Sequence, residues 1–111
     1  NVELDWAIIG QKIRYSSQFP NGTNVNFVKK INNTLEVITY EKGVEKIMQS
    51  CASGSVAAAY HMQKKYDLDY NLNIKVLGGE LSITTDPNWK NVWLTGETKL
   101  LFSSTIDINV L

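Results

Sequence analysis

The sequence predicts an α+β fold in which an antiparallel or mixed β-sheet, or a barrel-like sheet, wraps around one central helix. Several runs alternate β-branched or aromatic residues with polar ones, as half-buried strands do. Short clusters of Asn, Gly and Pro separate these runs, which is typical of hairpin turns. One long stretch after Cys51 is instead rich in alanine, which favours a helix. Strands gathered around a single main helix indicate α+β architecture.

The first element that we expect is a short amphipathic helix in "ELDWAIIGQKIRYS". Trp6, Ile9 and Ile13 follow helical spacing, so they would share one face. Asp5 precedes them and is a candidate N-cap, because its carboxylate can accept from the first free N–H groups. Gly10 is expected to weaken the helix, since glycine loses more backbone freedom on folding than other residues do.

Residues 24–40 are predicted to form a β-hairpin. "FPNGT" carries turn residues and leads into "NVNFVKK", in which apolar and polar residues alternate. Asn32 and Asn33 tolerate the left-handed conformations of a tight turn, and the β-branched run "LEVITY" follows them.

The central helix is predicted from Cys51 to about Asp67, with Ser50 or Ser53 as its N-cap. One stripe of this helix is expected to consist of Val56, Ala59, Tyr60 and Gln63. Three alanines beside Gly54 give the start of this helix little bulk, so we expect it to lie deep against the sheet.

The remaining elements are predicted as strands in meander order. "NIKVL" and "ELSITT" flank Gly78-Gly79, which is the clearest hairpin signal in the chain. "DPNWKN" reads as a further turn, followed by strand candidates "VWLTG" and "TKLLFSS" and by the alternating run "TIDINVL".

Composition restricts the classes of function. The chain has 111 residues, enough for a single domain (1–111) with one core. Its 11 basic and 11 acidic residues balance, so neither nucleic acid nor an anionic membrane is expected as the main partner. The single cysteine and the single histidine, His61, cannot build a disulfide framework or a structural zinc site. We therefore expect no metal, and a reducing, cytoplasmic location.

Cys51 has two interpretations on local chemistry. A cysteine at a helix N-terminus faces unpaired N–H groups and the positive end of the helix dipole, which both favour a thiolate. The N–H groups of Ala52, Ser53 and Gly54 would form an anion site beside that sulfur, suited to a carboxylate. However, a free cysteine is often just a small buried apolar residue, and local chemistry alone favours that simpler interpretation.

From Gly22 to Gly96, the order of motifs resembles the C-terminal half of diaminopimelate epimerase, a cofactor-independent amino acid epimerase. The matching motifs are "FPNGTNVNFV", "TYEKGVE", "SCASGS" followed by "VAAAY", "LGGELSI" and "VWLTGETKLLF". They look like the family's Asn-Val-x-Phe strand, Tyr-Glu-Arg-Gly turn, Cys-Gly-Thr-Gly helix start, Pro-Gly-Gly-x-Leu hairpin and Leu-x-Gly-x-x-x-x-Phe closing strands. Five motifs in the same order make the resemblance specific.

The resemblance implies two pseudo-symmetric domains, each with strands around a central helix, and an active site between them. One cysteine from each half exchanges the α-proton of diaminopimelate, converting the LL to the meso form for lysine and peptidoglycan synthesis, without metal or other cofactor. Cys51 matches the catalytic cysteine of the C-terminal half. Asn26, Glu41 and Lys42 match substrate-binding positions, and Ala52 and Ser53 match residues whose N–H groups bind the reacting carboxylate.

The chain also departs from the family pattern. Lys42 stands in place of Arg, which replaces a planar fork by a point charge. Ile47 and Met48 replace a polar Glu-Thr pair before the cysteine, and Leu77 replaces the Pro of the glycine hairpin. Ala52 and Ser53 replace Gly and Thr. The N-terminal half, with the second cysteine, is not in these 111 residues.

Three functional hypotheses remain. The first is the C-terminal half of a diaminopimelate epimerase, whose partners would be the amino acid substrate and the N-terminal half, and which would be inactive alone. The second is a non-catalytic binding or assembly domain of the same fold, and the third an isomerase or racemase of another amino acid. Because an isolated half would expose the apolar face of its cleft, we also expect self-association, with a homodimer as the simplest form.

The other conspicuous residues have simpler explanations. His61 lies almost three helical turns beyond Cys51, so we expect it at the surface. Trp6, Trp89 and Trp93 are scattered without basic residues between them, which indicates packing rather than a stacking platform for bases.

Overall fold

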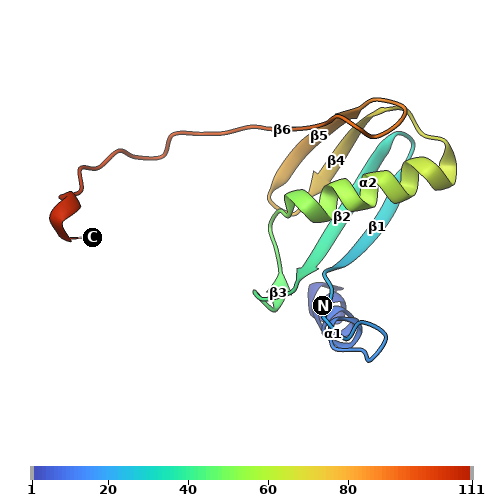
Figure 1. The fold of residues 1–111 in the computed structure, drawn as a ribbon, viewed down its shortest axis with the longest axis horizontal. Helices are drawn as coiled ribbons and strands as arrows, with labels where there is room; N and C mark the ends of the chain where they lie inside the picture. Colours follow the sequence, from blue (N-terminus) through green and yellow to red (C-terminus); the bar gives the residue numbers. More distant parts are fainter. Residues whose placement is uncertain (1, 111) are drawn as a thin grey trace.

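A computed structural model describes residues 2–110, with side chains from Asp5 onward (Figure 1). Its helices are α1 (Val2–Arg14), α2 (Ala52–Tyr66) and the short 3-10 helix η1 (Ile108–Val110). Its strands are β1 (Val25–Ile31), β2 (Thr34–Glu41), β3 (Lys46–Ile47), β4 (Asn71–Val76), β5 (Gly79–Thr85) and β6 (Val92–Gly96). None of the helices described is long and apolar enough to span a bilayer.

The strands form one mixed sheet in the order β1-β2-β4-β5-β6, with β3 paired to the end of β2. The neighbours β2 and β4 run parallel, and the other pairs are antiparallel. A parallel pair needs a crossover connection, which α2 supplies by packing across one face of the sheet (Figure 1). The predicted α+β class, with a mixed sheet around one main helix, is confirmed.

The predicted hairpin of residues 24–40 is present as β1 and β2. Ile31 pairs with Thr34, so the loop is the two residues Asn32 and Asn33. Asn32 has φ 55°, the left-handed conformation that asparagine tolerates and that two-residue hairpin turns require. The second predicted hairpin is also confirmed, because Val76 pairs with Gly79 across Leu77 and Gly78.

The core lies between α2 and the sheet. Ala58 and Ala59 have exposed fractions of 4% and 0%, so the helix backbone comes close to the strands as its small residues predicted. Of the predicted stripe, Ala59 and Gln63 are buried and Val56 is half-buried, but Tyr60 is exposed. The sheet contributes five buried apolar side chains to the core: Leu35, Val37, Leu72, Ile74 and Ile83.

Enlarging the buried side of α2 is expected to destabilise the protein. Ala59→Leu adds three carbons where no space is left, so we expect a loss of about 1–3 kcal/mol in the free energy of unfolding. Ala57 is exposed on the same helix, and Ala57→Leu should change that free energy by less than about 0.5 kcal/mol. Urea unfolding of both variants measures the difference, and equal losses would contradict the close packing of α2.

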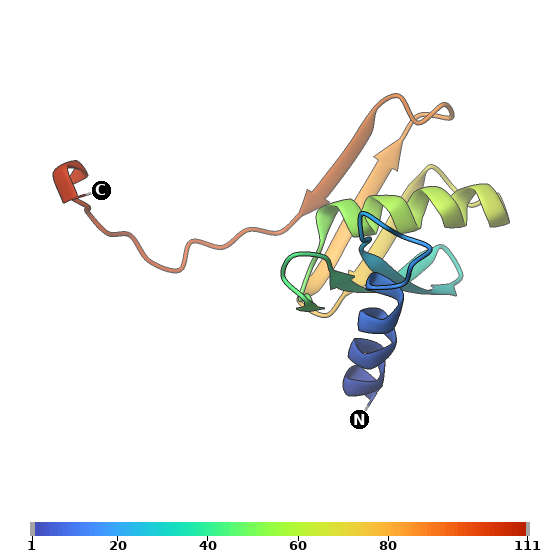
Figure 2. The same ribbon diagram turned by 60° about the horizontal axis from the view of Figure 1, so that its bottom comes forward.

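Helix α1 packs on the opposite side of the β1–β2 hairpin from α2 (Figure 2). The Trp6 ring lies 4.5 Å from that of Phe27, centroid to centroid. Gly10 is buried, and a Cβ added to it would come within 2.7 Å of the Tyr40 Cβ. Gly10 is therefore the point where the helix touches the sheet, not the weakness that we expected.

One other expectation about α1 is wrong. Asp5 is not the N-cap, because the helix already begins at Val2. Ile9 and Ile13 remain 42% and 37% exposed, so the apolar stripe is only partly covered. The helix meets the strands through Gly10 and Trp6, which rotates the two isoleucines toward solvent.

The predicted strand "VWLTG" is present as β6, but the strands predicted in "TKLLFSS" and "TIDINVL" are wrong for the described residues. Residues 97–107 have no regular structure, and 108–110 form η1; Leu111 lies outside the described residues. Figure 1 shows this segment running away from the sheet beyond β6, with Leu100, Leu101 and Phe102 at least 80% exposed. Their sequence favours a strand, but a strand requires a neighbour, and none of the described strands pairs with them.

Candidate active site at the start of helix α2

Cys51 itself caps α2, so the prediction of Ser50 or Ser53 as N-cap is wrong. Its backbone is extended (φ −142°, ψ 111°), and its Sγ accepts a hydrogen bond from the Gly54 N–H at 3.4 Å. The Ser53 Oγ lies 3.5 Å from the same sulfur. Sulfur takes the place that a serine or aspartate oxygen usually occupies at an N-cap. The thiol is only partly buried, so it can be approached from solvent.

The first backbone N–H groups of α2 surround this sulfur. The earliest helical hydrogen bond runs from the Ser55 N–H to the Cys51 carbonyl at 2.9 Å, and the Gly54 N–H is taken by Sγ. The N–H groups of Ala52 and Ser53 precede that bond, and helix geometry leaves them without intrahelical acceptors. Both residues are exposed. The arrangement suits an anion whose neighbouring carbon would lie beside the sulfur.

Asn26 and Thr39 form the floor under this helix start. They pair across β1 and β2, and the Thr39 hydroxyl donates to the Asn26 Oδ1 at 2.8 Å. A Cβ on Gly54 would lie 2.5 Å from that Oδ1, 2.7 Å from the Thr39 Oγ1 and 3.2 Å from the Cys51 Sγ. Gly54 is therefore the contact through which Cys51 and Asn26, two residues singled out from the sequence, come together.

Thr39 is a site residue that was not named from the sequence. It is buried, with 4% of its surface exposed, and it fixes the orientation of the Asn26 amide by donating to its oxygen. Because that oxygen is occupied, the Asn26 Nδ2 is left to donate elsewhere. The sequence could have identified Thr39, because a two-residue loop at Asn32 and Asn33 places it opposite Asn26 in a hairpin.

Glu41 and Lys42 stand at the end of β2, two and three residues beyond Thr39. Side chains alternate along a strand, so Glu41 is on the same face as Thr39 and Asn26. The Lys42 N–H donates to the Asn24 Oδ1 at 2.9 Å, and its ammonium donates to the Asn21 carbonyl. The structure thus holds this turn against the segment that precedes β1, and the lysine charge points to that segment.

The segment before Cys51 is fixed from two sides. The Met48 N–H donates to the Thr39 carbonyl at 2.9 Å, and the Gly78 N–H donates to the Gln49 carbonyl at 2.7 Å. A Cβ on Gly78 would come within 3.0 Å of that carbonyl oxygen, so the β4–β5 hairpin packs closely on it. Ile47 pairs with Tyr40 in the β2–β3 ladder and is half-buried. Ile47 and Met48, which stand where the family has a polar pair, therefore belong to a packed segment.

A network around Glu45 lies at the other end of the Glu41–Lys42 turn. Its Oε1 accepts from the Arg14 guanidinium at 3.0 Å and from the Gly43 N–H at 2.9 Å. The Tyr40 hydroxyl lies 3.4 Å from its Oε2. The Gly43 N–H, and with it the Arg14 guanidinium, lowers the pKa of the Glu45 carboxyl despite some loss of solvation. Burial and the Glu45 charge raise the pKa of Tyr40.

Acid is expected to release this network. Because the pKa of Glu45 is lower in the folded protein than its ordinary value of 4.5, its charged form stabilises the fold above that value. This contribution is lost as the pH falls through the lowered pKa. The free energy of unfolding of Glu45→Gln should therefore approach that of the unmodified protein as the pH falls below 4.5. If the difference in free energy of unfolding between Glu45→Gln and the unmodified protein stayed constant with pH, the lowered pKa of Glu45 would be contradicted.

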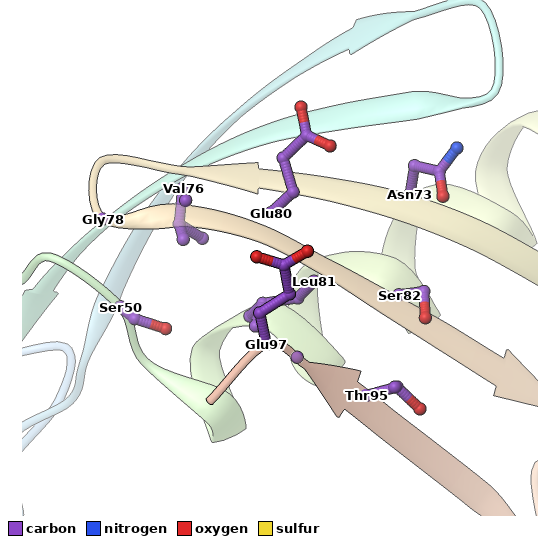
Figure 3. A pocket seen from close by; sticks show the side chains of 11 residues that line it. Ser50, Asn73, Val76, Gly78, Glu80, Leu81, Ser82, Thr95 and Glu97 are labelled. Atoms are coloured by element: carbon purple, nitrogen blue, oxygen red, sulfur yellow. The ribbon is translucent and has the colours of Figure 1, made fainter. Parts of the chain in front are cut away.

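An open cleft lies beside this site, not on it. It has a volume of about 710 Å³ and is lined by Ser50, Asn73, Val76, Gly78, Gly79, Glu80, Leu81, Ser82, Thr95, Gly96 and Glu97. Figure 3 shows Ser50, the residue before Cys51, across the cleft from Thr95. None of the site residues predicted from the sequence lines this cleft. The Cys51 site is instead an open surface at the helix start.

Comparison with known proteins identifies the family. The diaminopimelate epimerase family model matches residues 2–101. The diaminopimelate epimerase of Archaeoglobus fulgidus is 35% identical over 111 residues, which is all of this chain and 39% of that protein. That of Methanothrix thermoacetophila is 43% identical over 84 residues, covering 76% of this chain and 30% of its own length. The chain therefore spans well under half the length of these relatives.

Solved structures agree on the fold. A PhzF-family phenazine biosynthesis protein from Enterococcus faecalis superposes with a TM-score of 0.56 at 16% identity, over 77% of this chain and 30% of that one. The PhzF-family protein of Bacillus anthracis gives the same TM-score at 18% identity, over 83% of this chain and 29% of its own. From the family model and the sequence relatives, the chain belongs to the diaminopimelate epimerase family.

Proposed function

We propose that this chain is the C-terminal, Cys51-bearing domain of a diaminopimelate epimerase, completed by an N-terminal half that carries the second cysteine. The observation that supports it most directly is the convergence of Cys51, Gly54 and Asn26 at one helix start. Family membership over residues 2–101 supports the substrate class. In this proposal the protein acts in the cytoplasm, in the pathway to lysine and peptidoglycan.

In the proposed reaction the Cys51 sulfur exchanges one proton with the α-carbon of diaminopimelate. A thiolate on one side removes the α-hydrogen as a proton and becomes a thiol, leaving the electron pair on carbon. The thiol on the opposite side then donates its proton to that carbon from the other face and becomes a thiolate. Net charge and atoms are conserved, and the stereocentre is inverted. Cys51 serves as the base in one direction and as the acid in the other.

The main difficulty of this reaction is the weak acidity of a carbon next to a carboxylate. The developing negative charge spreads onto the carboxylate oxygens, so fixed donors there lower the barrier. The N–H groups of Ala52 and Ser53 are such donors, because α2 holds them in place before the reaction begins. The Asn26 amide, fixed by Thr39, would bind a second polar group of the substrate. Glu41 would pair with its ammonium.

The test uses the intact protein, in which this chain is joined to the proposed N-terminal half. Deuterium incorporation at the α-carbons of LL-diaminopimelate in D₂O is monitored by NMR. We expect loss of the α-proton signal and formation of the meso isomer. Cys51→Ala should abolish both. No exchange by the unmodified protein with any amino acid would overturn the proposal and favour a non-catalytic binding or assembly domain.

Lys42 supports a second candidate, an isomerase or racemase of another amino acid. Its ammonium is engaged by the Asn21 carbonyl, whereas the family's arginine would present a fork to a carboxylate. A substrate with a different second polar group would then be preferred. Measuring α-proton exchange across a panel of amino acids separates the two candidates. An isomerase or racemase of another amino acid must exchange that substrate faster than diaminopimelate.

A further inference from the structure

Arg14 connects three segments that are distant in sequence. It belongs to the last turn of α1, and its Nε and Nη2 both lie 3.0 Å from the Glu45 Oε1. The guanidinium also lies 4.5 Å from the centroid of the Tyr15 ring and against Gly22, where any added Cβ would collide with it. One side chain from the end of α1 therefore contacts the residue after that helix, the turn before β1 and the turn after β2.

Glu45 is held in an unusual backbone conformation. Its φ is 59°, and that of Gly43 in the same turn is 91°. A left-handed conformation is ordinary for glycine but disfavoured for glutamate, so it requires compensating contacts. The Glu45 carboxylate supplies them by accepting both from Arg14 and from the Gly43 N–H. The shape of the turn thus depends on this carboxylate.

Glu41 is the last residue of β2, and Lys42 follows it at the start of the same turn. Lys42 is also bonded to Asn24 through its N–H and to Asn21 through its ammonium. The two turns, 41–45 and 19–24, therefore meet next to the strand position of Asn26, with Arg14 in contact with both. A shift of the 41–45 turn would displace Glu41 relative to Asn26.

We propose that Arg14 and Glu45 are positioning residues that hold the Glu41–Lys42 turn in the geometry needed to bind the substrate. The role rests on the proposed function, since Glu41 must contact substrate for its position to matter. Neither residue touches the reacting atoms. They act through the turn, so their loss weakens substrate binding more than it slows proton transfer.

The pair also contributes to stability, because its side chains are only 15% and 29% exposed, so the test needs a control ion pair away from the turn. Lys75 and Glu36 form a more exposed pair between β4 and β2, at 3.8 Å with side chains 60% and 36% exposed. Glu36 lies opposite Lys29 and Lys75 in the sheet, and it serves as the control.

The experiment compares KM and kcat of Glu45→Gln, Arg14→Met, Arg14→Lys and Glu36→Gln in the intact protein with diaminopimelate. Losing a hydrogen bond to a charged group is expected to raise KM about tenfold or more in Glu45→Gln and Arg14→Met, with kcat within about threefold. Arg14→Lys, which keeps the charge, should recover part of the loss. Glu36→Gln should leave both constants unchanged. An unchanged KM in Glu45→Gln, or an equal rise in Glu36→Gln, would overturn the inference.

A second measurement is independent of activity. Amide hydrogen exchange of the intact protein, read by mass spectrometry, should become faster in a peptide covering residues 40–46 of Glu45→Gln, while a peptide covering α2 keeps its rate. Unchanged exchange in residues 40–46 overturns the positioning role even if the enzyme is active. If the unmodified protein has no activity, the proposed function fails, and the exchange rates still decide whether Glu45 holds the turn.

Discussion

Cys51→Ser is expected to leave the fold intact and to remove almost all α-proton exchange. Serine is among the preferred N-cap residues, and its hydroxyl can accept from the Gly54 N–H as the sulfur does. The free energy of unfolding should therefore stay within about 1 kcal/mol of the original or rise. A serine hydroxyl is a far weaker acid than a thiol, so the exchange rate should fall at least about 100-fold, the range attributed to acid–base catalysis.

The experiment measures both α-proton exchange and the free energy of unfolding in the Cys51→Ser variant. α-Deuterium exchange gives the chemical role of residue 51, and urea unfolding gives its structural role. Cys51→Ala serves as the reference that loses both the acceptor and the acid, and should be less stable by about 0.5–2 kcal/mol. If Cys51→Ser exchanged protons at the original rate, the sulfur would be only a cap.

Gly54→Ala is expected to damage both the fold and the site. On an exposed helix this change stabilises by about 1 kcal/mol, because alanine favours the helix. At Gly54 the new methyl group would lie 2.5 Å from the Asn26 Oδ1 and 2.7 Å from the Thr39 Oγ1, so the helix start must move away from the strands. We expect a net loss of about 1–3 kcal/mol in the free energy of unfolding.

The matched control is the neighbouring residue. Ser53→Ala changes an exposed side chain, and its free energy of unfolding should differ by less than about 0.5 kcal/mol. Gly54→Ala should also lower α-proton exchange, because it separates Cys51 from Asn26, and a shift of the Asn26 side-chain amide signals in NMR would report that separation directly. Stability equal to or above the original would show that the helix start is not tightly packed on Asn26 and Thr39.

Local signals predicted the elements that depend on neighbours in sequence. The Asn32-Asn33 turn and the alanine run after Cys51 determine their own conformations, and both appeared where expected. The strand predicted around Phe102 is wrong. Its sequence favours a strand, but a strand needs a pairing partner, and local sequence does not specify one.

Long-range contacts were not predictable from periodicity. Gly10 was expected only to weaken its helix, because sequence spacing does not show which helix residue faces a strand and so did not predict its contact with Tyr40. The ion pair between Arg14 and Glu45 joins residues that are far apart in the chain and that no motif links. Cys51 and Asn26 were named from the order of the motifs, but that order does not show that both lie against Gly54, because this contact joins a strand to a helix start.

The parallel pairing of β2 with β4 has a consequence for how the domain folds. The β1–β2 and β4–β5 hairpins join residues close in sequence, so they can form early, whereas pairing Thr34 with Asn73 must wait until α2 bridges the two halves. The helix start that carries Cys51 lies within that late connection. We therefore expect the slow step of folding to be the pairing of β2 with β4 together with the packing of α2 on the sheet. The Cys51 thiol then reaches its final surroundings only when the whole sheet is assembled.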